Sequence, residues 1–210
     1  MEAIALSSNN GKVAPKSKAQ YDESKVKTLS SLEHIRLRTG MYIGRLGSGG
    51  DPDDGIYILL KEVVDNAIDE FIMGHGKLVE VSIENDTVRI RDYGRGIPLG
   101  KIVECVSVIN TGAKYNDDVF QFSVGLNGVG TKAVNALSSH FRVTAYRDGQ
   151  YTEAVFERGA LKSHSKKGKT NEADGTFVEF LPDTDIFGDY EFNYEFILSL
   201  IHISEPTRQK

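Results

Sequence analysis

Glu62, Asn66 and Glu70 stand four residues apart in the apolar-rich segment IYILLKEVVDNAIDEFIMG. In a helix this spacing places them in one stripe at the margin of the apolar face. A carboxylate and a carboxamide one turn apart suit a general base that orients a water molecule beside an oxygen ligand for Mg²⁺. The alternative is an ordinary acidic helix face, and the helix alone does not exclude it.

Asp92 ends the segment TVRIRD, in which Val88, Ile90 and Asp92 alternate with other residues. In a strand this alternation turns Asp92 toward the core just before Gly94 breaks the strand. A buried carboxylate needs a hydrogen-bond donor or loses its charge, and an adenine amino group is such a donor. Gly94 and Gly96 would let the backbone approach a flat base closely. Alternatively, Asp92 is a turn residue that accepts hydrogen bonds from its own backbone.

A glycine-rich segment, GLNGVGTK, runs from Gly125 to Lys132. A P-loop would need lysine directly after the second glycine, but Thr131 separates Gly130 from Lys132, and a Rossmann motif would need glycine where Asn127 stands. We therefore expect a backbone wrap whose N–H groups, together with the N-terminus of the next helix, face an anion. The alternative is a flexible loop.

Periodicity along the chain predicts the elements that position these residues. Residues 1–20 lack a period and are expected to form a flexible arm. Helices are predicted at about 29–38, 56–72, 99–110 and 129–139. Strands are predicted at 79–83, 87–92, 141–146, 151–157 and 176–181. The lysine-rich segment 162–169 is expected to be a solvated loop. This order predicts an α+β fold, with a mixed, mostly antiparallel sheet and helices on one face.

Composition restricts the class of protein. With 210 residues, 40% of them apolar, the chain can bury one good core, so one main domain is expected. The single cysteine, Cys105, cannot build a disulfide framework or a zinc quartet, which fits a cytoplasmic protein. No segment has the length of a signal peptide or a membrane span. The net charge of −5 argues against direct DNA binding by this chain.

Five segments, in order, resemble a known family: KEVVDNAIDE, RDYGRGIP, TGAKY, GLNGVGTKAVNALS and DGTFVEF. They combine ExxxN on a helix, DxGxG after a strand and a glycine-rich lid before a second helix, as in the GHKL ATPases with their Bergerat ATP-binding fold. More closely, they resemble the ATPase domain of the B subunit of bacterial type IIA DNA topoisomerases. The resemblance runs from about Tyr21 to Leu198, and it favours topoisomerase IV over gyrase.

The resemblance implies ATP and Mg²⁺ as cofactors and gives each candidate residue a role. Glu62 would be the catalytic base that aligns the attacking water, and Asn66 would be the magnesium ligand. Asp92 would bind the adenine amino group, assisted by Thr176 through a water molecule. The other residues that it places around the cofactor are Glu70, Gly94, Arg95, Gly96, Ile97 and Pro98.

Further residues would cover the nucleotide. The lid over the phosphates would contain Lys114, Gly125, Leu126, Asn127, Gly128, Val129 and Gly130. Tyr21 matches an arm tyrosine that reaches the nucleotide of the partner subunit, which implies a homodimer formed around Mg·ATP. Arg147 matches an arginine at the pocket mouth that is associated with coumarin-type inhibitors.

The resemblance also implies which larger protein the chain belongs to. It implies an ATP-hydrolysing DNA topoisomerase, an isomerase that passes DNA strands together with an A-type subunit, of which this chain is an ATPase fragment. The chain stops before the family's transducer and metal-binding domains. Two alternatives stay open: the ATPase domain of another GHKL protein, such as a mismatch-repair protein, a chaperone or a histidine kinase, or a non-catalytic nucleotide-binding module.

The expected domain division has an arm at 1–20, the ATPase domain at 21–200 and a tail at 201–210. The segment DYEFNYEFILSL is expected to be the closing helix of the domain. The tail IHISEPTRQK contains Pro206 and has no counterpart in the resemblance, so it is expected to be non-native or disordered and to lack packing partners.

Overall fold

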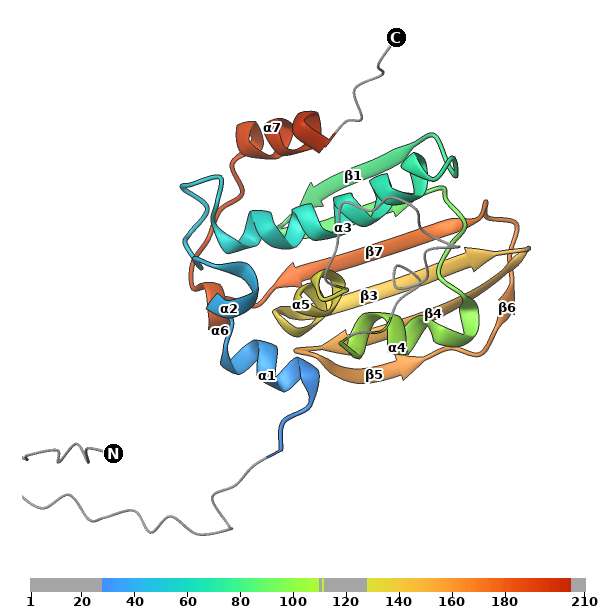
Figure 1. Ribbon diagram of the computed structural model, residues 1–210, viewed down its shortest axis with the longest axis horizontal. Helices are drawn as coiled ribbons and strands as arrows, with labels where there is room; N and C mark the ends of the chain where they lie inside the picture. Colours follow the sequence, from blue (N-terminus) through green and yellow to red (C-terminus); the bar gives the residue numbers. More distant parts are fainter. Residues whose placement is uncertain (1–27, 110, 112–127, 205–210) are drawn as a thin grey trace, which may run out of the picture.

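The computed structural model describes residues 28–109, 111 and 128–204. Figure 1 shows a twisted sheet with helices laid across one of its faces. The strand order is β1-β2-β7-β3-β4-β5, and β6 pairs with β4. All of these pairings are antiparallel. The predicted α+β arrangement is therefore confirmed, and the described part of the sheet is antiparallel throughout.

The described sheet has seven strands, and along the first and the fourth of them burial alternates as predicted. The strands are β1 (Val79–Glu84), β2 (Thr87–Asp92), β3 (Ser138–Arg147), β4 (Gln150–Glu157), β5 (Ala160–His164), β6 (Gly168–Lys169) and β7 (Gly175–Pro182). Asn85 and Asp86 join β1 to β2 with φ angles of 49° and 60°. This left-handed geometry suits a tight hairpin, and Asn and Asp tolerate it better than other non-glycine residues.

The segment 162–169, expected as a loop, is largely strand. Leu161 of β5 pairs with Phe156 of β4. Lys162 lies on β5 and forms an ion pair with Glu157 at 3.0 Å. The connecting turn has φ angles of 51° at Arg158 and 80° at Gly159. The loop prediction was wrong for 162–164 and 168–169, where backbone pairing with β4 outweighs the polar composition, whereas the expected solvent exposure of the lysines is confirmed.

The helices of the described chain are mostly short. They are α1 (Ser31–Leu37), α2 (Gly40–Ile43), α3 (Gly55–Ile72), the 3₁₀ turn η2 (Leu99–Lys101), α4 (Ile102–Ser107), α5 (Gly130–Ala136), α6 (Thr184–Phe187) and α7 (Tyr194–Ser204). Ser30 and Glu33 form a reciprocal capping box that starts α1. No helix in the described ranges is long and apolar enough to cross a membrane.

The core lies between the sheet and the helical layer, with α3 at its centre (Figure 1). Leu59 and Leu60 of α3 are fully buried in the same apolar cluster as Ile90 of β2, Phe141 of β3 and Phe180 of β7. Because α3 packs on β1, β2 and β7 at once, its polar flank is held in a fixed orientation over the sheet.

The C-terminal helix continues beyond the expected domain boundary at residue 200. Helix α7 runs to Ser204, and Ile201 packs against the core cluster. The expectation that residues from 201 on lack packing partners is therefore wrong for Ile201, because the helical repeat of the preceding residues carries this apolar side chain back toward α3. Pro206 lies outside the described residues.

Candidate functional site

Two polar residues of α3 lie against the start of α5. The Asn66 side-chain amide donates to Thr131 Oγ1 at 3.0 Å and to the Glu62 carbonyl at 2.5 Å. A Cβ atom at Gly130 would overlap the Glu62 carboxylate, so any other residue there would force the Glu62 side chain to move. The fold thus joins the predicted stripe on the long helix to the end of the predicted glycine-rich lid.

The third member of the stripe, Glu70, has a different partner. Its carboxylate accepts hydrogen bonds from the Arg95 guanidinium at 3.0 Å and from the Arg95 backbone N–H at 2.9 Å. Burial acts to raise the pKa of Glu70, but the bonds from Arg95 outweigh it and hold that pKa below its usual range. A Cβ atom at Gly94 would collide with the Glu70 side chain. This ion pair therefore fixes the turn after β2 to the end of α3.

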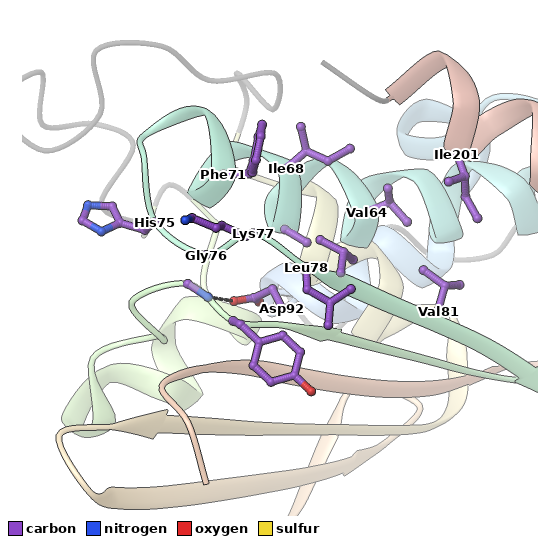
Figure 2. Close-up of a pocket in the computed structure, with 14 residues that line it drawn as sticks. Val64, Ile68, Phe71, His75, Gly76, Lys77, Leu78, Val81, Asp92 and Ile201 are labelled. Atoms are coloured by element: carbon purple, nitrogen blue, oxygen red, sulfur yellow. Dashed lines mark hydrogen bonds between the residues drawn. The ribbon is translucent and has the colours of Figure 1, made fainter. Parts of the chain in front are cut away.

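Asp92 ends β2 with its carboxylate buried at 8% exposure. Its Oδ1 atom accepts from the Gly94 backbone N–H at 2.9 Å (Figure 2) and from the Thr176 backbone N–H at 3.2 Å. Burial raises the pKa of Asp92 to about 6, although these two hydrogen bonds act in the opposite direction. The side chain is therefore buried, as the strand alternation predicted, and it also accepts a hydrogen bond from its own turn, as the alternative predicted.

The raised pKa predicts an unusual pH dependence of stability. An unfolded aspartate loses its proton near pH ~4, whereas folded Asp92 keeps it to about pH 6. As the pH rises between these two values, folded Asp92 keeps a proton that the unfolded chain has lost, so the free energy of unfolding falls. Above both values the contribution of Asp92 to that free energy is constant. The free energy of unfolding of Asp92→Asn, relative to that of wild type, should therefore rise between pH 4 and pH 7, by about 3 kcal/mol at most. Urea unfolding at both pH values measures this; a pH-independent difference would contradict the raised pKa.

The rim next to Asp92 is built from tightly packed backbone. Gly96 has a φ of 71°, and a Cβ atom there would strike the Tyr146 and Gly175 carbonyl oxygens. Ile97 packs against the core cluster, and Pro98 precedes η2. The turn GRGIP therefore lies directly against the ends of β3 and β7.

Two basic residues, of which only Arg147 was predicted at the site, occupy different settings. Arg147 ends β3 and lies 3.6 Å from the Asp148 carboxylate at an exposed position. Lys132, which was not predicted to bind phosphate, is buried and donates to the Thr111 carbonyl at 2.7 Å. Its ammonium group thus has a backbone partner inside the protein.

Part of the predicted lid can be located. Gly128 has a left-handed φ of 58°, and Val129 precedes the first residue of α5, Gly130. The other predicted lid and arm residues lie outside the described residues: Tyr21, Lys114, Gly125, Leu126 and Asn127.

An apolar hollow on the other flank of α3 was not predicted. It has a volume of about 240 Å³, and its walls include Val64, Ile68 and Ile201 (Figure 2). It touches the site described above through Asp92 and Gly94, and neither Glu62 nor Asn66 lines it. The repeated apolar residues on that side of α3 were visible in the sequence, but the contribution of α7 was not.

Within the described chain, no three His, Cys, Asp or Glu side chains gather in a cluster that could hold a metal ion. A magnesium ion at this site would have few protein ligands. The Asn66 Oδ1 atom is an oxygen ligand of the kind that magnesium prefers. Mg²⁺ accepts this arrangement because it keeps several waters and shares ligand phosphates. The residues present therefore fit magnesium as a partner of a bound phosphate group.

Comparison with known proteins gives close sequence relatives. The B subunit of DNA topoisomerase 4 from Borreliella burgdorferi is 66% identical over 177 residues, which are 84% of this chain and 29% of that protein. The B subunit of DNA gyrase from Enterococcus faecalis is 38% identical over 186 residues, which are 83% of this chain and 28% of that protein. The chain thus spans less than a third of the length of these relatives.

The fold and the family model agree with these relatives. The structure of the 43K ATPase domain of Thermus thermophilus gyrase B in complex with an aminocoumarin matches with a TM-score of 0.66 at 29% identity, over 81% of this chain and 44% of that one. The model of the histidine kinase-, DNA gyrase B- and HSP90-like ATPases matches residues 51–185. That match spans more than half of the chain, which therefore belongs to this ATPase family.

Proposed function

We propose that this chain binds ATP with its adenine at Asp92 and its phosphates between α3 and α5. The observation that carries the proposal is the buried Asp92 carboxylate, whose Oδ1 atom is held by two backbone N–H groups. An adenine amino group would donate to this carboxylate and stabilise its charge in a buried place. Gly94 and Gly96 give the base a flat, close backbone surface.

The same site supports hydrolysis. Glu62 lies on the flank of α3 that meets Gly130, where the lid glycines precede α5. In our proposal, Glu62 is the general base that orients the attacking water and takes its proton. Bound magnesium would neutralise charge on the phosphates, and Asn66 would hold it through Oδ1.

Replacing Asn66 should separate metal-dependent binding from adenine recognition. Asn66→Ala removes one magnesium ligand atom and the bond to Thr131. We expect the affinity for a non-hydrolysable ATP analogue to fall about tenfold with magnesium present and to change little with EDTA, because only the metal-bound complex uses this atom. Thr131→Val, which removes the same hydrogen bond but no metal ligand, is the control. An equal loss with and without magnesium in Asn66→Ala would contradict the assignment.

We further propose that the full-length protein is a type IIA topoisomerase B subunit. The similarity to topoisomerase 4 and gyrase B subunits supports this over other members of the ATPase family. In it, two copies would dimerise around Mg·ATP, with Tyr21 reaching the partner's nucleotide, and would drive DNA strand passage with an A-type subunit in the cytoplasm. ATP-dependent relaxation of supercoiled DNA by the full-length protein with its A-type partner tests this. Nucleotide binding without any topological change in DNA would contradict it.

A further inference from the structure

Arg91 is the neighbour of Asp92 in β2, and strand alternation places it on the opposite face of the sheet. Its guanidinium carbon lies 4.5 Å from the centre of the Tyr93 ring and 4.6 Å from the centre of the Tyr146 ring. Stacking between two aromatic rings orients a planar cation, and here Arg91 is only 8% exposed. The guanidinium group is therefore held in one place.

Its donors reach the main chain of β2 and of the segment before β7. Nη1 donates to the carbonyl of Asp92, and Nη2 donates to the carbonyl of Ala173 at 2.5 Å. Ala173 lies three residues before Thr176, whose N–H donates to the Asp92 carboxylate at 3.2 Å. One side chain thus joins the end of β2 to the segment that leads into β7.

The packing around this link is close. Gly175 has a φ of 137°, and a Cβ atom there would strike the Asp92 carbonyl and Arg91 Nη1. The Tyr146 and Gly175 carbonyls in turn lie against Gly96 on the rim. Movement of the guanidinium group would therefore be transmitted to the backbone on both sides of Asp92.

We propose that Arg91 is a positioning residue for base recognition. By tying the Asp92 and Ala173 carbonyls together, it sets the direction of the Asp92 carboxylate relative to Thr176, and so the selectivity for a purine that carries an amino group. The inference rests on the proposed ATP site. Arg91 does not contact the base, since it lies on the other face of β2.

Arg89 provides a matched control on the same strand and the same face. It is paired with Glu179 at 2.6 Å and with Glu84 at 3.2 Å. Like Arg91, it joins β2 to β7, but its partners lie away from Asp92. A role in sheet stability alone would be shared by both arginines, whereas a role in base recognition belongs to Arg91.

The experiment compares the affinity of the 210-residue chain for non-hydrolysable ATP and ITP analogues with magnesium. Hypoxanthine carries an oxygen where adenine has its amino group, so the ATP/ITP ratio of affinities reports recognition by Asp92. We expect Arg91→Met to lower this ratio about tenfold, mainly through weaker ATP binding. Arg91→Lys, which keeps the cation but not the two-pronged donor group, should restore only part of it, and Arg89→Met should leave it at the wild-type value.

The outcomes separate the two proposals. Wild-type protein that binds neither analogue would refute the proposed function and this inference with it. Wild-type protein that prefers ATP, with an unchanged ratio in Arg91→Met or an equal fall in Arg89→Met, would refute the inference alone. If Arg91→Met does not fold by circular dichroism, Tyr146→Leu decides: it removes one ring of the stack and should lower the ratio, whereas an unchanged ratio would overturn the inference.

Discussion

Glu62→Gln in the full-length protein is expected to lower the rate of ATP hydrolysis at least a hundredfold, since general-base catalysis contributes roughly 10²–10⁴. The amide keeps the shape of the side chain but cannot take a proton from water. Because the glutamine side chain has the same size and the same place against Gly130, the packing between α3 and α5 should not change. The affinity for a non-hydrolysable ATP analogue should therefore stay within about threefold of wild type, because one neutral hydrogen bond contributes little.

Asp65→Asn is the matched control for this variant. Asp65 lies on the same helix, three residues after Glu62, and is buried in an ion pair with Lys61. The variant loses the same charge at a residue outside the proposed ATP site, so we expect a steady-state hydrolysis rate near that of wild type. Wild-type turnover in Glu62→Gln would show that another residue is the base, and a joint loss of turnover and binding would show that Glu62 holds the nucleotide instead.

Asp92→Asn should abolish measurable nucleotide binding by the 210-residue chain while preserving its fold. The asparagine oxygen can still accept from the Gly94 and Thr176 N–H groups, but its amide nitrogen then faces the adenine amino group, donor against donor. An unsatisfied donor at a buried site costs about 1–3 kcal/mol, in addition to the lost charged hydrogen bond. Titration calorimetry with a non-hydrolysable ATP analogue measures the loss.

Asp86→Asn removes the same charge from the opposite end of the β1–β2 hairpin. Asparagine tolerates the left-handed backbone there, where φ is 60°. This control should bind as wild type does and unfold at a similar temperature. Undiminished affinity in Asp92→Asn would refute the adenine assignment, and a folding defect would be evident from the thermal midpoint.

The features that the sequence predicted are those encoded by local patterns. The 3.6-residue period of α3 and the alternation of β2 fixed which flank holds Glu62 and which face holds Asp92. The same periods gave the strands β1 to β4 and β7. These signals are reliable because they depend on neighbours within a few residues.

The features that were missed depend on contacts between distant segments. Residues 160–164 have no apolar alternation of their own, and only the partner strand β4 makes them a strand. The stack of Arg91 on Tyr146 and its bond to Ala173 join positions far apart in the chain. The contact of Ile201 with the core likewise depends on where α7 lies. The periodicity of a single segment carries no information about such long-range contacts.

A crystal structure of this chain with magnesium and a non-hydrolysable ATP analogue would test the central claim most directly. We expect the adenine amino nitrogen about 2.7–3.2 Å from the Asp92 carboxylate, and magnesium about 2.0–2.1 Å from Asn66 Oδ1. The phosphates should lie between α3 and α5, next to Glu62 and Gly130. A nucleotide with its base in the apolar hollow beside Ile201, or with its base away from Asp92, would contradict the account.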